Sequence, residues 1–169
     1  MYFSKDELAA MGVSIGENTL ISNLVRFYGC KAVIGSNVRI DDFCIIKGNI
    51  EIGDYVHIGA FSILAGGGAK ITIGSRVGIS SRGNLFTGTE DFSSDKRGNP
   101  TMSPGCSDVR DVIVGEIKIE DDVIIGSLVT ILPNVRIGNN VSLGANLIIA
   151  RNIPSNCKII SNSRLVKIS

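Results

Sequence analysis

The sequence is poor in several of the residues that most often carry chemistry. Its 169 residues include no tryptophan, one histidine, four prolines and four cysteines. The cysteines, at positions 30, 44, 106 and 157, form no CxxC pair, so we expect free thiols in a reducing compartment rather than disulfides or a zinc site. The formal net charge is +1, which gives no overall field for nucleic acid or an acidic membrane. No signal-peptide pattern opens the chain and no apolar run approaches the roughly 18 residues of a membrane span, so we expect a cytoplasmic protein.

What the sequence does contain is a repeat with a period of six. An aliphatic or aromatic residue recurs at this spacing, glycine often follows it, and a small or branched residue comes four places later. This period fits neither a helix of 3.6 residues per turn nor the period-two alternation of an antiparallel sandwich. It suits a triangular coil with three short strands per turn. The main series is Ile15, Ile21, Phe27, Ile34, Ile40, Ile46, Ile52, Ile58, Leu64, Ile73, Ile79, Leu85, Ile119, Ile125, Ile131, Ile137, Leu143 and Ile149.

The repeat therefore predicts one all-β domain over residues 1–169, a parallel β-helix whose interior is a column of aliphatic side chains. Glycine or asparagine is expected at the corners, where the backbone bends. Residues 65–69 insert roughly three residues into one turn, and residues 86–112 lack the repeat and are expected to form an extended loop. A capping box from Ser4 to Glu7 predicts a short helix within residues 1–12 that covers the first turn. Residues 154–169 are expected to be a C-terminal tail.

Several segments resemble known enzymes. The stretches IEDDVIIGS (119–127), ILPNVRIG (131–138) and RNIP (151–154) resemble the hexapeptide-repeat acyltransferases, which implies a left-handed β-helix. Within that family, VRIDDFCI (38–45), YVHIGAF (55–61) and GTEDFS (88–93) look like the branch that N-acylates nucleotide-linked amino-dideoxy sugars. The resemblance implies a homotrimer with active sites in the clefts between subunits, an acyl-coenzyme A donor such as acetyl-CoA lying along the C-terminal turns, and no metal.

The first candidate catalytic residue is His57, because it precedes the inward Ile58 and so points outward near a corner. It could act as a general base or orient the acceptor, or it could be an ordinary surface or interface histidine. Asp91, by analogy with the family segment, could bind the sugar amine and take up its proton, although a solvated loop carboxylate is the plain alternative. The register stacks Ile58 beneath Ile79, whereas Glu90 follows the Leu85 face and lies at a different corner from His57. The two side chains could meet within one prism only if the loop folds far back, so we expect any cooperation between them to be across subunits.

Other candidates follow from their positions in the turns. Serines and asparagines there are often structural, and terminal arginines and lysines often only solubilise, so each assignment has an ordinary alternative. The candidates for binding the acceptor are Ser80, Ser81, Asn84 and Glu90. The candidates for binding coenzyme A are Ser127, Leu128, Ala145 and Asn146 for its pantetheine arm, and Arg151, Arg164 and Lys167 for its phosphates.

The resulting prediction is acyl-CoA-dependent N-acylation of a nucleotide-linked amino-dideoxy sugar in surface-polysaccharide (lipopolysaccharide) biosynthesis. A neutral amine attacks a thioester with little help beyond alignment and a proton acceptor, whereas a hydroxyl needs a strong base. The long loop has no histidine to serve as that base. O-acetylation of a sugar or polysaccharide precursor, with His57 as base, is the alternative. A zinc carbonic anhydrase would need three histidines, and a non-catalytic scaffold would not be expected to carry a long charged loop.

Overall fold

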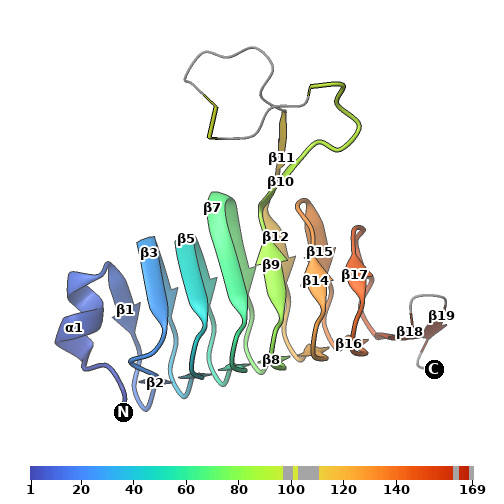
Figure 1. Ribbon diagram of the computed structural model, residues 1–169. Coiled ribbons are helices and arrows are strands. Elements are labelled where there is room, and N and C mark those ends of the chain that lie inside the picture. The colour runs from blue at the N-terminus through green and yellow to red at the C-terminus, as the bar shows by residue number, and fades with distance from the viewer. Residues whose placement is uncertain (97–100, 103–110, 162–163, 168–169) are drawn as a thin grey trace.

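The structure, a computed structural model, describes residues 1–96, 101–102, 111–161 and 164–167, with the backbone alone for 161 and 164–167. These residues form a left-handed parallel β-helix of about seven turns, as the repeat and the resemblance predicted. Figure 1 shows a prism with a helix at its N-terminal end, a small hairpin at its C-terminal end and one long excursion rising from its side.

Three faces make up the prism. Face 1 holds β1 (Val13–Ile15), β12 (Ile117–Ile119), β15 (Val135–Ile137) and the second halves of β3 (Arg26–Ile34), β5 (Ile45–Ile52) and β7 (Ile63–Ile73). Face 3 holds the first halves of β3, β5 and β7, then β9 (Asn84–Phe86), β14 (Thr130–Ile131) and β17 (Ile148–Ile149). Face 2 holds β2 (Leu20–Ile21), β4 (Arg39–Ile40), β6 (His57–Ile58), β8 (Gly78–Ile79), β13 (Ile124–Ile125), β16 (Ser142–Leu143) and β18 (Cys157–Ser161). We call the bend from face 1 to face 2 the first corner and the bend from face 2 to face 3 the second corner.

The core consists of the two inward series that the sequence predicted. In the main series every residue is buried except Ile15 and Phe27 near the N-terminal end, which are partly buried. The second series, four places on, is buried at the polar Ser62, whose hydroxyl donates to the Gly59 carbonyl at 2.7 Å, and at Val38, Cys44, Ile50, Val56, Val77, Val123, Val129, Val135 and Val141. Equivalent residues stack turn upon turn, as where Ile58 pairs with Ile79. The core is therefore continuous along the axis of the prism.

The corners correct one expectation about glycine. The residues with positive φ at the bends are mostly not glycine, and the glycines that follow the aliphatic residues do not have positive φ. A Cβ on Gly35 would lie 2.7 Å from the Gly53 carbonyl carbon of the next turn, so glycine is needed there for close approach of two backbones. The non-glycine residues with positive φ are Asn18, Asn37, Tyr55, Arg76, Asp122, Asn140 and Asn156 at the first corner, Phe43, Phe61, Arg82, Leu128 and Asn146 at the second, and Asn134 between face 3 and face 1.

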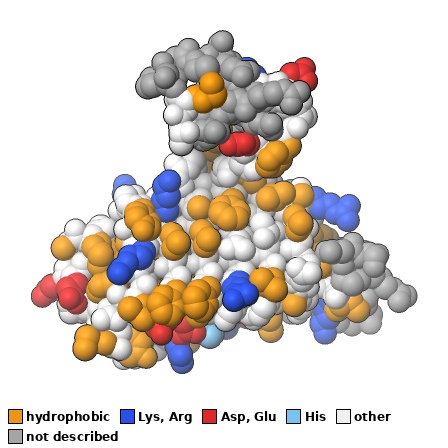
Figure 2. All heavy atoms as spheres, in the orientation of Figure 1, with side chains coloured by type: hydrophobic (Ala, Val, Ile, Leu, Met, Phe, Trp, Pro, Cys, Tyr) orange, Lys and Arg blue, Asp and Glu red, His pale blue; other side chains and the backbone are white. Residues whose placement is uncertain are grey.

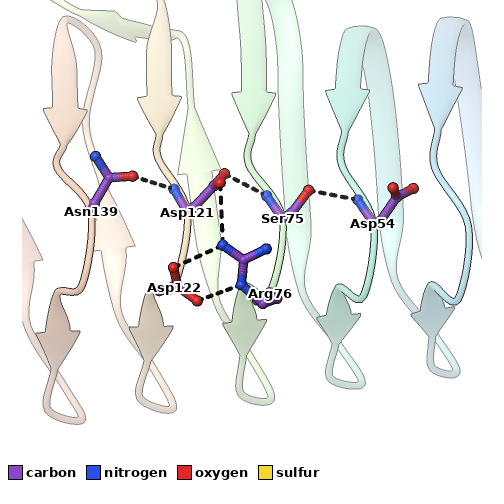
Figure 3. A network of polar contacts seen from close by, with 6 residues as sticks. All are labelled: Asp54, Ser75, Arg76, Asp121, Asp122 and Asn139. Carbon is purple, nitrogen blue, oxygen red and sulfur yellow. Dashed lines mark hydrogen bonds and ion pairs between the residues drawn. The ribbon is translucent and has the colours of Figure 1, made fainter.

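A ladder of side-chain acceptors runs up the first corner. In each turn one side-chain oxygen accepts a hydrogen bond from the backbone N–H of the equivalent residue one turn earlier, at 2.7 to 3.1 Å. Figure 3 shows the central part, where Arg76 also pairs with two carboxylates. The ladder spans the long loop, since Asp121 accepts from Ser75 at 2.9 Å although 46 residues separate them. Its members are Glu17, Ser36, Asp54, Ser75, Asp121, Asn139 and Ser155.

The N-terminal end of the prism is covered by α1 (Lys5–Ala10). The predicted capping box is present, because the Ser4 hydroxyl accepts from the Glu7 N–H and the Glu7 carboxylate accepts from the Ser4 N–H at 2.7 Å. Leu8 is fully buried against the first turn. At the other end, residues 154–169 do more than form a tail. Within them β18 extends face 2 by pairing with β16 and turns back into β19 (Arg164–Lys167).

The two interruptions behave differently. The Gly66–Gly68 insertion is absorbed within β7, where the pairing with β5 shifts from Gly48 opposite Gly66 to Ile50 opposite Ile71, which accommodates three extra residues. The long loop rises on an antiparallel ribbon of β10 (Gly88–Glu90) and β11 (Val112–Val114). The predicted loop, 86–112, therefore begins and ends inside ordered strands, and its residues 97–100 and 103–110 lie outside the described part of the chain.

Candidate functional site

A hollow on face 2 collects several of the predicted residues. It has a volume of about 350 Å³ and lies where β6, β8 and β13 expose their outward positions. Register explains the grouping, because His57 lies directly opposite Gly78, which has no side chain to fill the space. The hollow is lined by Asp41, His57, Gly59, Gly78, Ile79, Ser80, Ser81, Ile124 and Ser127.

His57 is held by a carboxylate that the sequence analysis did not single out. Its Nε2 lies 2.8 Å from Asp41 Oδ2, and Arg39 Nε donates to Asp41 Oδ1 at 2.7 Å. Partial burial of Asp41 opposes its ionisation, but the hydrogen bonds from His57 and Arg39 outweigh it, so the pKa of Asp41 lies below its ordinary value. Asp41 is therefore an anion that orients the imidazole. The six-residue register contained this signal, since it stacks Arg39 beneath His57 and puts Asp41 diagonally across from it.

Ser80 and Ser81 stand on the far side of the hollow from Asp41. Both side chains are exposed. Their backbone is held by hydrogen bonds between neighbouring turns of face 2, as where the Ser80 N–H donates to the Ile125 carbonyl at 2.8 Å. The turn below them carries Gly59, where a Cβ would lie 2.6 Å from the Ser81 nitrogen. The predicted Asn84 does not line this hollow. It lies on face 3, and its side chain donates to the Arg82 carbonyl at 3.2 Å.

Glu90 and Asp91 lie on the ribbon of the long loop. The Asp91 carboxylate accepts from the Ser93 hydroxyl at 2.6 Å and from the Ser93 N–H at 2.9 Å, and these two bonds lower the pKa of Asp91. Glu90 lines another hollow, of about 360 Å³, together with Lys47 and Val114. Within one chain Glu90 belongs to β10, beyond face 3, and Asp91 directly follows it, whereas His57 belongs to face 2.

The candidates for binding coenzyme A are spread over the C-terminal turns. Ser127 lines the hollow, and Leu128 and Asn146 are second-corner residues with positive φ. The Asn146 N–H donates to the Ser127 carbonyl at 2.8 Å, and Ala145 beside it is exposed. Arg151 lines a hollow of about 350 Å³ at the C-terminal end. Arg164 and Lys167 belong to β19, and their side chains lie outside the described part.

Three further observations concern metal binding, membrane-spanning helices and the cysteines. Among the described residues, no group of three or more histidine, cysteine, aspartate or glutamate side chains could hold a metal ion. In the same part of the chain, no helix is both long and apolar enough to cross a membrane. Cys30, Cys44 and Cys157 are free thiols, and Cys106 lies outside the described residues.

The fold and the repeat place the chain among the left-handed β-helix proteins, and comparison with known proteins gives its class. The family model "Bacterial transferase hexapeptide (six repeats)" matches residues 31–66 and 116–151. The chain is 40% identical over 139 residues to the dTDP-4-amino-4,6-dideoxy-D-glucose acyltransferase of Escherichia coli, an alignment that covers 79% of this chain and 70% of that one. The chain therefore belongs to the hexapeptide-repeat acyltransferases and is an acyltransferase.

Solved structures give the same family. AntD, an N-acyltransferase from Bacillus cereus, in complex with dTDP-4-amino-4,6-dideoxyglucose and coenzyme A, matches with a TM-score of 0.89 and 34% identity over 98% of this chain and 89% of that chain. AntD in complex with dTDP and 3-hydroxybutyryl-CoA also matches with a TM-score of 0.89 and 34% identity, over 98% and 88% of the two chains. These structures include variants of AntD in which a serine, or an aspartate ten positions further on, is replaced.

Proposed function

We propose that this protein transfers an acyl group from acyl-CoA to the amino group of a dTDP-linked 4-amino-4,6-dideoxy sugar. The observation that carries the proposal is the agreement between two relatives. The Escherichia coli enzyme is named for this acceptor, and AntD is described in complex with the same acceptor and coenzyme A. This also fits the absence of histidine from the long loop.

The spacing of two predicted residues supports a specific site. Ser81 and Asp91 are ten positions apart, and no other serine in this chain has an aspartate ten positions after it. The serine and the aspartate replaced in the AntD variants have the same spacing. Ser81 lines the hollow on face 2, and Asp91 is an anion presented by the ribbon. In a homotrimer the Asp91 of one subunit would complete the hollow of a neighbour, which gives three equivalent sites.

The chemistry of these groups assigns their roles. Asp91 has a lowered pKa and is a weak base, so its main task is to bind and orient the sugar amine as a hydrogen-bond acceptor. The amine nitrogen then attacks the thioester carbonyl carbon, the C–S bond breaks, and the leaving coenzyme A thiolate takes the proton that the amine loses. Because a thioester is already activated, alignment of donor and acceptor supplies much of the rate enhancement. His57, oriented by Asp41, would contact the acceptor in the same hollow.

The surroundings of the site follow from the same proposal. Coenzyme A would lie along the second corner at Ser127, Leu128 and Asn146, with Arg151 near its phosphates. The reaction would take place in the cytoplasm, where acyl-CoA and nucleotide sugars are made. Its product would enter surface-polysaccharide biosynthesis, since activated sugars are the donors for that pathway.

The test is acyl transfer measured by release of the coenzyme A thiol, with acetyl-CoA and 3-hydroxybutyryl-CoA as donors. The acceptors are dTDP-4-amino-4,6-dideoxyglucose and the matching sugar with a 4-hydroxyl group. We expect turnover of the amino sugar alone, with kcat lowered at least about 100-fold in Asp91→Asn and about tenfold in Ser81→Ala. Asp95→Asn is the matched control, because Asp95 is an exposed carboxylate of the same loop and should leave turnover unchanged.

One observation favours a second candidate, O-acylation. The hydrogen bond between His57 and Asp41 is the arrangement that a general base for a hydroxyl would use. Turnover confined to the hydroxyl sugar, abolished in His57→Asn and retained in Asp91→Asn, would replace the N-acyl proposal with this one.

A further inference from the structure

Two aromatic side chains and an arginine form a ridge along the second corner, beside the hollow of face 2. The corner ridge, as we call it, consists of Phe43, Phe61 and Arg82, which occupy equivalent positions in three successive turns. The two rings are stacked with centroids 5.0 Å apart and planes at 23°, and the Arg82 guanidinium lies 5.9 Å from the centre of the Phe61 ring. Figure 2 shows a row of hydrophobic side chains along the prism, followed by a cationic side chain and close to the histidine.

The ridge is exposed and its backbone is strained. Each phenylalanine is 51% exposed, and their φ values are 61° and 63°, in the left-handed region that bulky side chains rarely adopt. Other residues fit this bend at least as well, since Asn146 occupies the same corner further on. Two exposed aromatic rings at strained positions add little to the core, which lies on the other side of the backbone. A ligand that uses their surface accounts for them better.

Hollows with polar walls flank the ridge. The hollow with His57 and Ser81 lies beside its Arg82 end. A second hollow, of about 430 Å³, is lined by Arg39, Asp42 and Ala60 among others, and Asp42 and Ala60 directly precede the two phenylalanines. The ridge therefore offers an apolar surface, a cation and hydroxyl groups in one line.

We propose that the corner ridge binds the nucleotide of the acceptor, with the base against Phe43 and Phe61 and the diphosphate at Arg82. This inference rests on the function proposed above and adds the place where the nucleotide part of the substrate is recognised. Bases bind to exposed aromatic side chains through their flat apolar surfaces, and guanidinium groups suit phosphate oxygens.

The order of groups along the axis favours a nucleotide over a second protein chain. Phe43 and Arg82 are two turns apart, or roughly 10 Å at the spacing of neighbouring strands, which suits an extended nucleoside diphosphate. Ser81 adjoins Arg82, so the sugar that follows the diphosphate reaches the proposed reacting centre. Beyond it on the same corner come Leu128 and Asn146, the candidates for coenzyme A. One corner would then align acceptor and donor end to end, with their reacting groups meeting between them.

The experiment replaces the two aromatic rings with a side chain that is known to fit the left-handed backbone conformation of this corner. In Phe43→Leu and Phe61→Leu the aromatic surface is lost, and Leu128 demonstrates that leucine fits this corner with φ of 64°. The matched control is Tyr55→Leu, since Tyr55 is an exposed aromatic residue with φ of 58° at the first corner. Binding of dTDP is measured by calorimetry, and KM and kcat are measured with the amino-sugar nucleotide and acetyl-CoA.

We expect Phe61→Leu and Phe43→Leu each to weaken dTDP binding and to raise the KM for the nucleotide sugar about tenfold, with kcat and the KM for acetyl-CoA unchanged. Tyr55→Leu should match wild type. Arg82→Gln should weaken the binding of dTDP and leave that of thymidine unchanged, because only the diphosphate meets the cation.

Two results would overturn the inference. Unchanged dTDP binding in both phenylalanine variants, with a wild type that acylates the amino sugar, would reject the ridge and leave the proposed function standing. A lower molecular mass of these variants in sedimentation, with dTDP binding normal in the assembled fraction, would make the ridge a subunit interface instead. A wild type that neither binds dTDP nor acylates the amino sugar would reject the proposed function itself.

Discussion

Replacing Asp121 tests what holds the prism together across its long loop. Asp121 is the first member of the corner ladder after the loop, and its Oδ1 accepts from the Ser75 N–H at 2.9 Å. Its other oxygen lies 3.4 Å from an Arg76 nitrogen. Asp121→Ala removes both interactions and leaves the Ser75 N–H without its side-chain acceptor. Asp121→Asn keeps an acceptor in place, as Asn139 does one turn further on.

The expected cost follows from these contacts. A hydrogen bond to a charged group contributes roughly 1.5–3 kcal/mol, and the Asp121 side chain is 45% exposed, so water can replace part of the lost bond. We therefore expect Asp121→Ala to lower the free energy of unfolding by about 1–2 kcal/mol. The ion pair with Arg76 is exposed and solvent-screened, so Asp121→Asn should cost less than about 1 kcal/mol.

Urea unfolding followed by circular dichroism, at one fixed protein concentration, measures the difference. Asp122→Asn is the control, because the Asp122 carboxylate pairs with Arg76 without belonging to the ladder, and asparagine tolerates the left-handed φ of 60° at this position. Equal losses in Asp121→Asn and Asp121→Ala would refute the reasoning, since they would assign the stability to charge rather than to the backbone acceptor.

Two further predictions concern the core. Burial raises the pKa of the Cys44 thiol to about 11, so at pH 8 its alkylation by iodoacetamide should be about 100-fold slower in the folded protein than in urea, as mass spectrometry of the labelled peptide would detect; equal rates would contradict this. Ile79→Ala should lower the free energy of unfolding by roughly 2–5 kcal/mol because Ile79 is 1% exposed within the stacked column. Ile124→Ala, at a position 62% exposed, should change it by less than about 0.5 kcal/mol in the same urea titration.

The fold could be predicted because the six-residue repeat determines which side chains face inward and how successive turns align. One aliphatic residue every six positions fixes which side chains enter the core, and stacking of equivalent residues then fixes the register, as for Ile58 and Ile79. The antiparallel ribbon from Gly88 to Val114 follows no repeat, and its pairing depends on how a long loop closes. β19 was missed for a similar reason, since it pairs by turning back and not by continuing the coil. β18 does continue face 2, but Ile159 pairs with Leu143 after 16 residues, two fewer than separate Leu143 from Ile125.

Only those site residues that lie within the repeat could be placed from the sequence, because their positions follow from the register between turns. His57, Ser80 and Ser81 occupy outward positions of face 2, and the structure brings them into one hollow. Asp41 belongs to the same set of outward positions, but it is recognisable only when the diagonal neighbours across two strands are compared. Where Asp91 lies relative to these groups is not encoded in the repeat, because it depends on how the long loop folds and, in the proposed trimer, on a neighbouring subunit.

The architecture separates stability from the loop that carries the proposed acceptor-binding residue. Face 1 resumes after the loop as though it were absent, with Ile117 pairing with Ile71, and the first-corner ladder resumes at Asp121. The free energy of closing a loop grows only slowly with its length. The stability of the core therefore depends little on the length of this loop. A sequence in the loop can then be suited to its acceptor without disturbing the register.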